Sequence, residues 1–170
     1  STVSNFSSGV NTISSSNTAT YKPTQTLTQT TYYRRQAKDG TCNTDWSNST
    51  NVWKVTVLPA FSAGNITGAS NSTQCQNYNP TVLTANPTGG AGTYTYQWQS
   101  SSNGTSWTNI SGATGKTFDP PALTATTHYR VMVDATGTPD CGGATASNNT
   151  IVFTIYPAFT AGTIANTGET

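Results

Sequence analysis

The sequence predicts an all-β protein made of tandem antiparallel β-sandwich repeats of about 98 residues. Two observations support this. The chain repeats itself, and its apolar residues alternate in short runs separated by Gly, Pro, Asn and Ser. Leu27 and Tyr33 recur as Leu123 and Tyr129, an offset of 96 (123 − 27). A period of this length corresponds to one small β-domain rather than to one coil of a solenoid.

The repeat also sets the expected domain boundaries. Pro59-Ala60-Phe61 recurs as Pro157-Ala158-Phe159, an offset of 98 (157 − 59), so each proline opens a repeat. We expect the C-terminal part of a truncated repeat (residues 1–58), a complete repeat (59–156) and the start of the next (157–170). The first part lacks the opening strands of a sandwich. We expect a preceding stretch of chain to supply them, with donation by another chain as the alternative.

The complete repeat shows about seven short strands and no helical period. Its clearest strand, TYTYQWQS, places Tyr94, Tyr96 and Trp98 on one face at a period of two. A Trp on a central strand is typical of immunoglobulin-like sandwiches, and a Tyr six residues after a Leu at a strand entrance is typical of fibronectin-like ones. The predicted core comprises Tyr94, Tyr96, Trp98, Leu123, Tyr129, Val131, Val133, Ile151, Phe153 and Ile155.

Composition excludes several classes of function. Charged residues make up 8% of the chain, whereas ordinary soluble domains have roughly 25%. Ser and Thr together make up about a third, so the surface is expected to be hydrated by hydroxyl groups. A net charge of +1 supplies no basic face for nucleic acid. No apolar run reaches the length of a membrane span, so direct membrane insertion is not expected.

The three cysteines suggest a disulfide framework. Cys42 and Cys141 hold the same place in successive repeats, and Cys75 lies early in the complete repeat. We therefore predict a Cys75–Cys141 disulfide, with Cys42 paired to a cysteine upstream of residue 1. Such a bond would stabilise the repeat by roughly 4 kcal/mol and would indicate an oxidising, extracellular setting. Three free, buried thiols are the alternative.

Catalysis is not expected. His128 is the single histidine, and Tyr32 replaces it in the first repeat, so no repeated nucleophile-and-base arrangement is possible. We predict that the chain is not an enzyme and binds no cofactor.

A metal site is not expected either. Acidic pairs occur at Asp39 with Asp45 and at Asp134 with Asp140. Two carboxylates plus carbonyl groups would make only a weak calcium site, and turn-forming Asp is the favoured interpretation. The single histidine and three cysteines do not make a tetrahedral zinc site if two of the cysteines are oxidised.

Aromatic side chains are the remaining candidates for binding. Trp107 lies on a short strand near the loop at Asn103, where an exposed ring would stack on a sugar. Trp46 and Tyr32 are weaker candidates of the same kind. Packing into the core is the alternative for all three, because most Trp residues in sandwiches are buried.

Four segments resemble a known family. They are YTYQWQSSSNG from Tyr94, ALTATTHYR from Ala122, TQTTYYRRQAKDGTCN from Thr28 and PAFTAGTIANTGET from Pro157. Together they resemble the Ig-like repeats of very large gliding motility adhesins on the surface of Bacteroidetes. The resemblance implies a protein secreted by the type IX system, located at the cell surface in association with the outer membrane, and moved by the gliding machinery. The partners it implies are neighbouring repeats, polysaccharide or other surfaces, and that machinery.

We therefore expect a structural and adhesive segment of a long cell-surface adhesin, serving as a stalk and a multivalent attachment module in gliding. One alternative is a carbohydrate-binding or spacer module of a secreted glycan-degrading enzyme. A weaker alternative is a filament assembled by strand donation.

Overall fold

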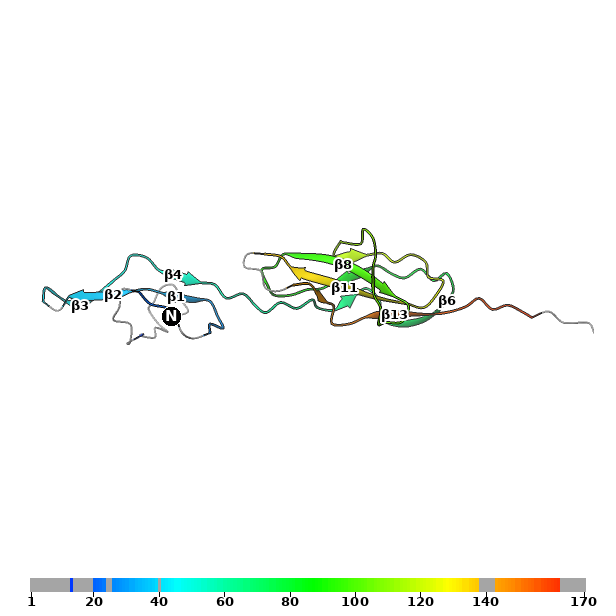
Figure 1. Ribbon diagram of the computed structural model, residues 1–170, viewed down its shortest axis with the longest axis horizontal. Coiled ribbons are helices and arrows are strands. Elements are labelled where there is room, and N and C mark those ends of the chain that lie inside the picture. Colours follow the sequence, from blue (N-terminus) through cyan, green and yellow to red (C-terminus); the bar gives the residue numbers. More distant parts are fainter. Residues whose placement is uncertain (1–12, 14–19, 24–25, 40, 138–142, 163–170) are drawn as a thin grey trace, which may run out of the picture. The chain divides into compact units, whose positions relative to one another are not determined.

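The computed structural model describes residues 13, 20–23, 26–39, 41–137 and 143–162, and the described chain is all-β, with thirteen strands and no helix (Figure 1). It divides into two compact units, Ser1–Pro59 (unit 1) and Ala60–Thr170 (unit 2), each described here by itself. The division falls one residue after the predicted boundary. Residues 157–162, expected to open a further repeat, contain no strand, and residues 163–170 lie outside the described part.

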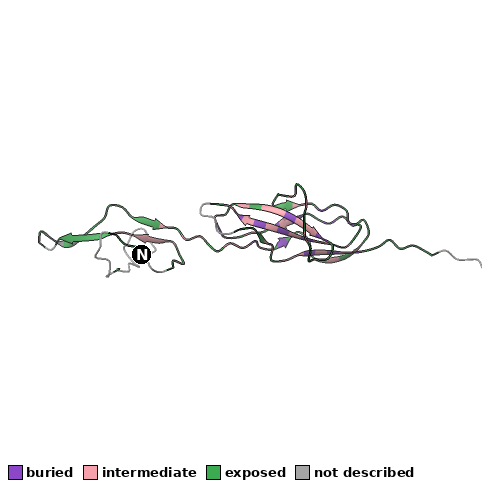
Figure 2. Cartoon of the chain, in the orientation of Figure 1, coloured by how far each residue is buried: buried purple, intermediate pink, exposed green. Residues whose placement is uncertain are grey.

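Unit 1 consists of two antiparallel strand pairs. β1 (Thr31–Tyr33) pairs with β4 (Trp53–Val55), and β2 (Gln36–Asp39) pairs with β3 (Asn43–Asn48). Every unit 1 residue whose side chain is described is exposed or half-buried, and Figure 2 shows no buried segment in these strands. This unit therefore has ladder hydrogen bonds but no closed core among its described residues.

Unit 2 is a sandwich of two sheets. The larger sheet has the order β6-β13-β11-β8-β9, with β12 also paired to β11, and the smaller has the order β10-β7-β5. The strands of the larger sheet are β6 (Ser72–Cys75), β8 (Tyr94–Ser101), β9 (Thr108–Asn109), β11 (Thr127–Ala135), β12 (Thr145–Ala146) and β13 (Ile151–Tyr156). Those of the smaller are β5 (Ile66–Thr67), β7 (Leu83–Ala85) and β10 (Thr117–Phe118). All pairings are antiparallel except that of β6 with β13, a topology of immunoglobulin type.

The core of unit 2 lies between the two sheets, because alternate residues of each strand point inward. Trp98 is fully buried, stacks on Phe118 at a centroid distance of 5.6 Å, and donates its indole N–H to the Gly115 carbonyl at 3.0 Å. Phe153 is also fully buried, and its ring meets the edge of Tyr129. The inward positions of β11 and β13 are Tyr129, Val131, Val133, Ala135, Ile151, Phe153 and Ile155.

Eight of the ten predicted core residues are buried; Tyr94 and Tyr96 are only half-buried and pack against the rim of the core. The Tyr94 hydroxyl donates to the Gly89 carbonyl at 2.7 Å and its ring stacks on Phe61, so this side chain closes one end of the sandwich instead of filling it. Burial, and then the neighbouring Tyr94, raise the pKa of Tyr96 above its ordinary value. Further buried residues were not among those predicted from the sequence: Ala63, Ile66, Leu83, Ala85 and Ala135.

Equivalent strands pair in the same register within each of the two units. In unit 1 Thr31 pairs with Val55, and in unit 2 Thr127 pairs with Phe153. The offsets are 96 (127 − 31) and 98 (153 − 55), the same as those in the sequence repeat.

Single hydrogen bonds recur at the same offsets. Ser49 N donates to Arg35 O at 2.7 Å, and Ser147 N donates to Val131 O at 2.8 Å. Residues 27–57 therefore form part of the same fold as residues 123–155.

Candidate functional site

Trp107 belongs to a small cluster on the outer face of the larger sheet. The Arg130 guanidinium lies over its ring, 4.4 Å from the centroid. Arg130 Nε donates to Gln99 Oε1 at 2.6 Å, and Gln99 Nε2 donates to Asn109 Oδ1 at 2.7 Å. We call these four residues, Trp107, Arg130, Gln99 and Asn109, the Trp107 cluster. Because β8 pairs with both β9 and β11, the sheet itself aligns the polar members.

The loop before Trp107 is fixed by its own side chains. Ser101 Oγ accepts hydrogen bonds from the backbone N–H groups of Asn103 (3.2 Å) and Gly104 (2.9 Å). Asn103 Oδ1 in turn accepts from the N–H groups of Thr105 (3.0 Å) and Ser106 (2.9 Å). Such side-chain turns hold the backbone in one conformation. The loop therefore presents Trp107 from a defined position.

Gly104 lets this loop lie close to the sheet. Its φ is +71°, and a Cβ at this position would lie 3.1 Å from Nδ1 of His128. The only histidine is thus half-buried on β11 beneath the loop.

The half-buried Trp107 ring is neither a core residue nor a free aromatic platform. One side of the ring faces the cation, so an approaching ligand meets the ring together with a guanidinium and two amide groups. This set can stack on a sugar ring and hydrogen-bond its hydroxyl groups. The other two aromatic candidates do not join it. Tyr32 lies in unit 1 with Lys54 5.7 Å from its ring centroid, and nothing is described of the Trp46 side chain.

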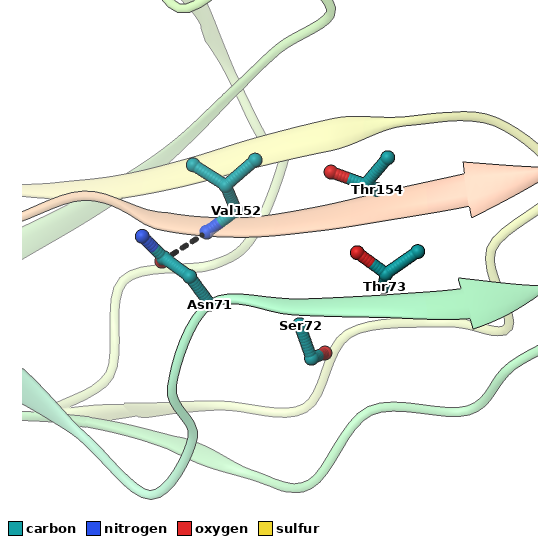
Figure 3. Close-up of a pocket in the computed structure, with 5 residues that line it drawn as sticks. All are labelled: Asn71, Ser72, Thr73, Val152 and Thr154. Carbon is teal, nitrogen blue, oxygen red and sulfur yellow. Dashed lines mark hydrogen bonds between the residues drawn. The ribbon is translucent and has the colours of Figure 1, made fainter.

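Two shallow hollows are lined by neutral residues. Figure 3 shows the first, of about 320 Å³, on β6 and β13, where Thr73 and Thr154 lie side by side and the Val152 N–H donates to Asn71 Oδ1 at 2.8 Å. The second hollow, of about 420 Å³, lies between the loop before Trp107 and the start of β11. Its lining residues are Ser100, Ser101, Ser102, Ser106, Thr108, Ala125, Thr126 and Thr127. Hydroxyl groups line both hollows, the amide of Asn71 lines the first, and neither lining contains a charged residue.

The predicted Cys75–Cys141 disulfide involves Cys141, which lies outside the described residues. Its described partner, Cys75, is an exposed and free thiol at the end of β6. Cys75 pairs with Tyr156, the last residue of β13, three residues after Phe153, which lies opposite Thr127.

Cys42 is free and exposed in the turn between β2 and β3. Its predicted partner upstream of residue 1 is not tested by this structure. The alternative of three buried thiols is wrong for Cys42 and Cys75, because both are exposed.

The acidic residues that the structure describes do not form a cluster. Asp39 Oδ1 accepts hydrogen bonds from the backbone N–H groups of Thr41 (2.9 Å) and Cys42 (2.7 Å), which is the turn-forming role expected of Asp. Asp45 is exposed, Asp134 is half-buried on β11, and Asp140 lies outside the described residues. Within the described part of the chain, no group of three His, Cys, Asp or Glu side chains could hold a metal ion.

These features define an all-β protein whose second unit is a β-sandwich with hydroxyl-lined hollows and an aromatic–cationic cluster on the outer face of its larger sheet. The chain belongs to the family described as a domain of unknown function (DUF8696), whose model matches residues 1–59 and 62–157. No curated protein and no solved structure matches the chain. In the stretches that the structure describes, no helix is long and apolar enough to cross a membrane.

Proposed function

We propose that this chain is a structural and adhesive segment of a long, secreted cell-surface adhesin. Tandem β-sandwich repeats would act both as a stalk and as a multivalent attachment module. The observation that supports it is the recurrence of one strand ladder in two consecutive units. Repetition adds length and copies of a weak binding surface without adding new chemistry. The resemblance to gliding adhesins extends the proposal to gliding motility, type IX secretion and association with the outer membrane.

The surface chemistry suits weak contacts with neutral, hydrated material. Charged residues are 8% of the chain, and hydroxyl groups line both hollows of unit 2. Long-range electrostatic attraction therefore contributes little, and attachment depends on the number of contacts.

Attachment as a function of density tests the adhesive role. The full chain is coupled to particles at rising density, and their retention on polysaccharide-coated glass is measured. A multivalent module gives retention that rises steeply with density although the soluble chain binds weakly. Retention that is absent at every density would reject the adhesive role.

The stalk role has its own test. Small-angle scattering from a longer natural stretch of the parent polypeptide should give a maximum dimension that grows with the number of repeats. A compact particle whose size grows only with the cube root of its mass would reject the stalk.

A second candidate function, glycan binding as an accessory module of a secreted enzyme, is favoured by the Trp107 cluster. Trp107→Ala should abolish retention on the polysaccharide that the chain recognises. Trp53→Ala is the matched control, because Trp53 is 59% exposed but lies in unit 1, outside the cluster. Glycan affinity in the soluble single chain, lost only in Trp107→Ala, would favour this function over the density-dependent one.

A further inference from the structure

Three polar side chains of the Trp107 cluster form a row across the outer face of the larger sheet. Arg130 on β11, Gln99 on β8 and Asn109 on β9 are neighbours, because Gln99 is paired with Arg130 on one side and with Asn109 on the other. Two hydrogen bonds join them, from Arg130 Nε to Gln99 Oε1 at 2.6 Å and from Gln99 Nε2 to Asn109 Oδ1 at 2.7 Å. We call these three residues the polar row.

The arginine sets the direction of both hydrogen bonds. A guanidinium has N–H donors and no acceptor, so Gln99 must turn its amide oxygen toward Arg130. The amide nitrogen of Gln99 then faces Asn109, which accepts with its own amide oxygen. Asn109 is exposed, and its Nδ2 group takes no part in the row. Each end of the polar row therefore has N–H donors to offer a ligand, from the terminal nitrogens of Arg130 and from Asn109 Nδ2.

Arg130 is held in place without being neutralised by a carboxylate of the described residues. The contacts that hold its guanidinium are the bond from Nε to Gln99 and the Trp107 ring, whose centroid lies 4.4 Å away. The bond to Gln99 leaves both terminal nitrogens, which form a fork that binds a carboxylate or a sulfate through parallel hydrogen bonds. The acid on the same strand, Asp134, is four residues away, or about 14 Å along β11.

The small number of charges in unit 2 limits what this cation can bind. Lys116 and Arg130 are the only lysine and arginine in residues 60–170 of the sequence. Nucleic acids and anionic membranes are bound by several cations acting together. One fixed guanidinium beside an aromatic ring suits a ligand that offers one anionic group and a surface that can stack.

We propose that the polar row binds an acidic polysaccharide through the oxyanion of one sugar ring, either a uronate carboxylate or a sulfate. The fork of Arg130 holds the oxyanion, Asn109 Nδ2 donates to a neighbouring sugar oxygen, and the half-buried Trp107 ring packs against the C–H face of the sugar. The inference rests on the second candidate function, glycan binding at the Trp107 cluster, and adds the chemical class of the glycan to it.

Two ligands that differ only in charge test the proposal. The full chain, labelled with nitrogen-15, is titrated with trigalacturonate and with its methyl ester, and NMR follows the Arg130 Nε–H and the Trp107 indole N–H. We expect trigalacturonate to bind about tenfold more tightly, because hydrogen bonds to a charged acceptor are stronger than those to a neutral one. This preference should shrink at high salt. Equal affinities would overturn the inference and leave glycan binding intact.

A sulfated ligand distinguishes the two sources of the oxyanion. A sulfated galactan trisaccharide and its desulfated form are titrated in the same way. Preference for the uronate over its ester alone assigns a carboxylate, and preference for the sulfated form alone assigns a sulfate. Preference for the charged form in both pairs supports the shared chemistry. Signals of Arg130 and Trp107 that move with neither charged ligand would overturn the inference.

Two variants with the same change in charge locate the binding. Arg130→Met and Lys116→Met each remove one positive charge from unit 2, but Lys116 is exposed immediately before β10 of the smaller sheet, outside the Trp107 cluster. Arg130→Met should lose the preference for the charged ligand, whereas Lys116→Met should keep it. Equal losses would show that net charge, and not the polar row, attracts the anion, and would reject the inference.

A third variant leaves the arginine and its contacts in place. Asn109→Asp keeps an oxygen that accepts from Gln99 Nε2 but replaces the Nδ2 donor with a carboxylate oxygen. We expect affinity for trigalacturonate to fall several-fold, affinity for the methyl ester to change little, and the unfolding midpoint to stay the same. Unchanged affinity for trigalacturonate would contradict the assigned row.

The titration and the particle-retention measurement separate this inference from the adhesive role. Retention that fails at every density rejects adhesion, although a charge-selective titration would still support the polar row. Retention that rises with density, together with equal binding of trigalacturonate and its ester, rejects the polar row and leaves adhesion standing.

Discussion

Residues 27–57 and 123–155 follow one backbone plan, but among the described residues only the second set has a buried core. Tyr33 pairs with Trp53 as Tyr129 pairs with Ile151, yet Trp53 is 59% exposed and Ile151 is 3% exposed. In unit 2 the sheet of β5, β7 and β10 packs across the inward positions, and in unit 1 no described strand does so. Strand pairing therefore fixes the register, whereas burial depends on a second sheet.

The largest difference in stability between equivalent variants of the two units is expected at the centre of the unit 2 core. Phe153→Ala should cost unit 2 about 3–5 kcal/mol, because a fully buried ring leaves a cavity between Tyr78 and Tyr129. The equivalent Val55→Ala should cost less than about 1 kcal/mol. Urea unfolding of the full chain, followed by intrinsic fluorescence and far-ultraviolet circular dichroism, measures both. Equal losses would mean that the ladder, and not the second sheet, stabilises each unit.

A smaller effect is expected where one side chain joins the two sheets of unit 2. The Ile66 N–H donates to Asn149 Oδ1 at 2.6 Å, and Asn149 Nδ2 donates back to the Ile66 carbonyl at 3.0 Å. Asn149→Ala should cost about 2–3 kcal/mol, since both bonds are lost and the partly buried peptide groups of Ile66 stay unsatisfied. Asn51, its counterpart in unit 1, is exposed, so Asn51→Ala should leave the unfolding midpoint nearly unchanged. A comparable loss of stability in Asn51→Ala would show that this side chain does not distinguish the two units.

A smaller difference in stability is expected when the cation of each cation–aromatic pair is removed. Arg130→Met removes a guanidinium 4.4 Å from the Trp107 centroid and its bond to Gln99, at a cost of about 1 kcal/mol. Lys54→Met removes a more distant cation, 5.7 Å from Tyr32, and should cost below about 0.5 kcal/mol. Thermal unfolding at matched salt compares them. A larger effect at Lys54 would show that distance does not rank these pairs.

The smallest effect at neutral pH is expected from Tyr129. Burial raises the pKa of its phenol above the ordinary value of 10.0. The folded state then holds a proton that the unfolded chain releases, so this stabilisation is complete below pH 10 and is lost as the pH rises further. Tyr129→Phe should flatten the decline in the stability of unit 2 above pH 10, measured by urea unfolding. Tyr33→Phe is the control in unit 1, and an unchanged slope in Tyr129→Phe would exclude Tyr129 as the cause.

The candidate site was only partly visible in the sequence. The sequence indicated Trp107 as a candidate because it lies near the loop at Asn103, where an exposed ring would stack on a sugar. Arg130 and Gln99 carried no such signal, since they are 31 residues apart and meet only because β8 and β11 pair in that register. The surroundings of Cys75 were hidden for a related reason. Matching repeats showed which cysteines are equivalent, but not that the parallel pairing of β6 with β13 places Cys75 opposite Tyr156.

The sequence by itself determined the all-β class, the repeat and most inward positions. Alternation of apolar residues fixes which face of a strand is buried once a second sheet covers it, and an internal repeat needs no knowledge of structure to be seen. Tertiary structure alone decided the length of strands as short as β5 and β10, the half-burial of Tyr94, the Trp107 cluster and the pairing of Cys75 with Tyr156. Each of these depends on which strands become neighbours. That choice follows from the summed packing of distant segments, and no local pattern of residues encodes it.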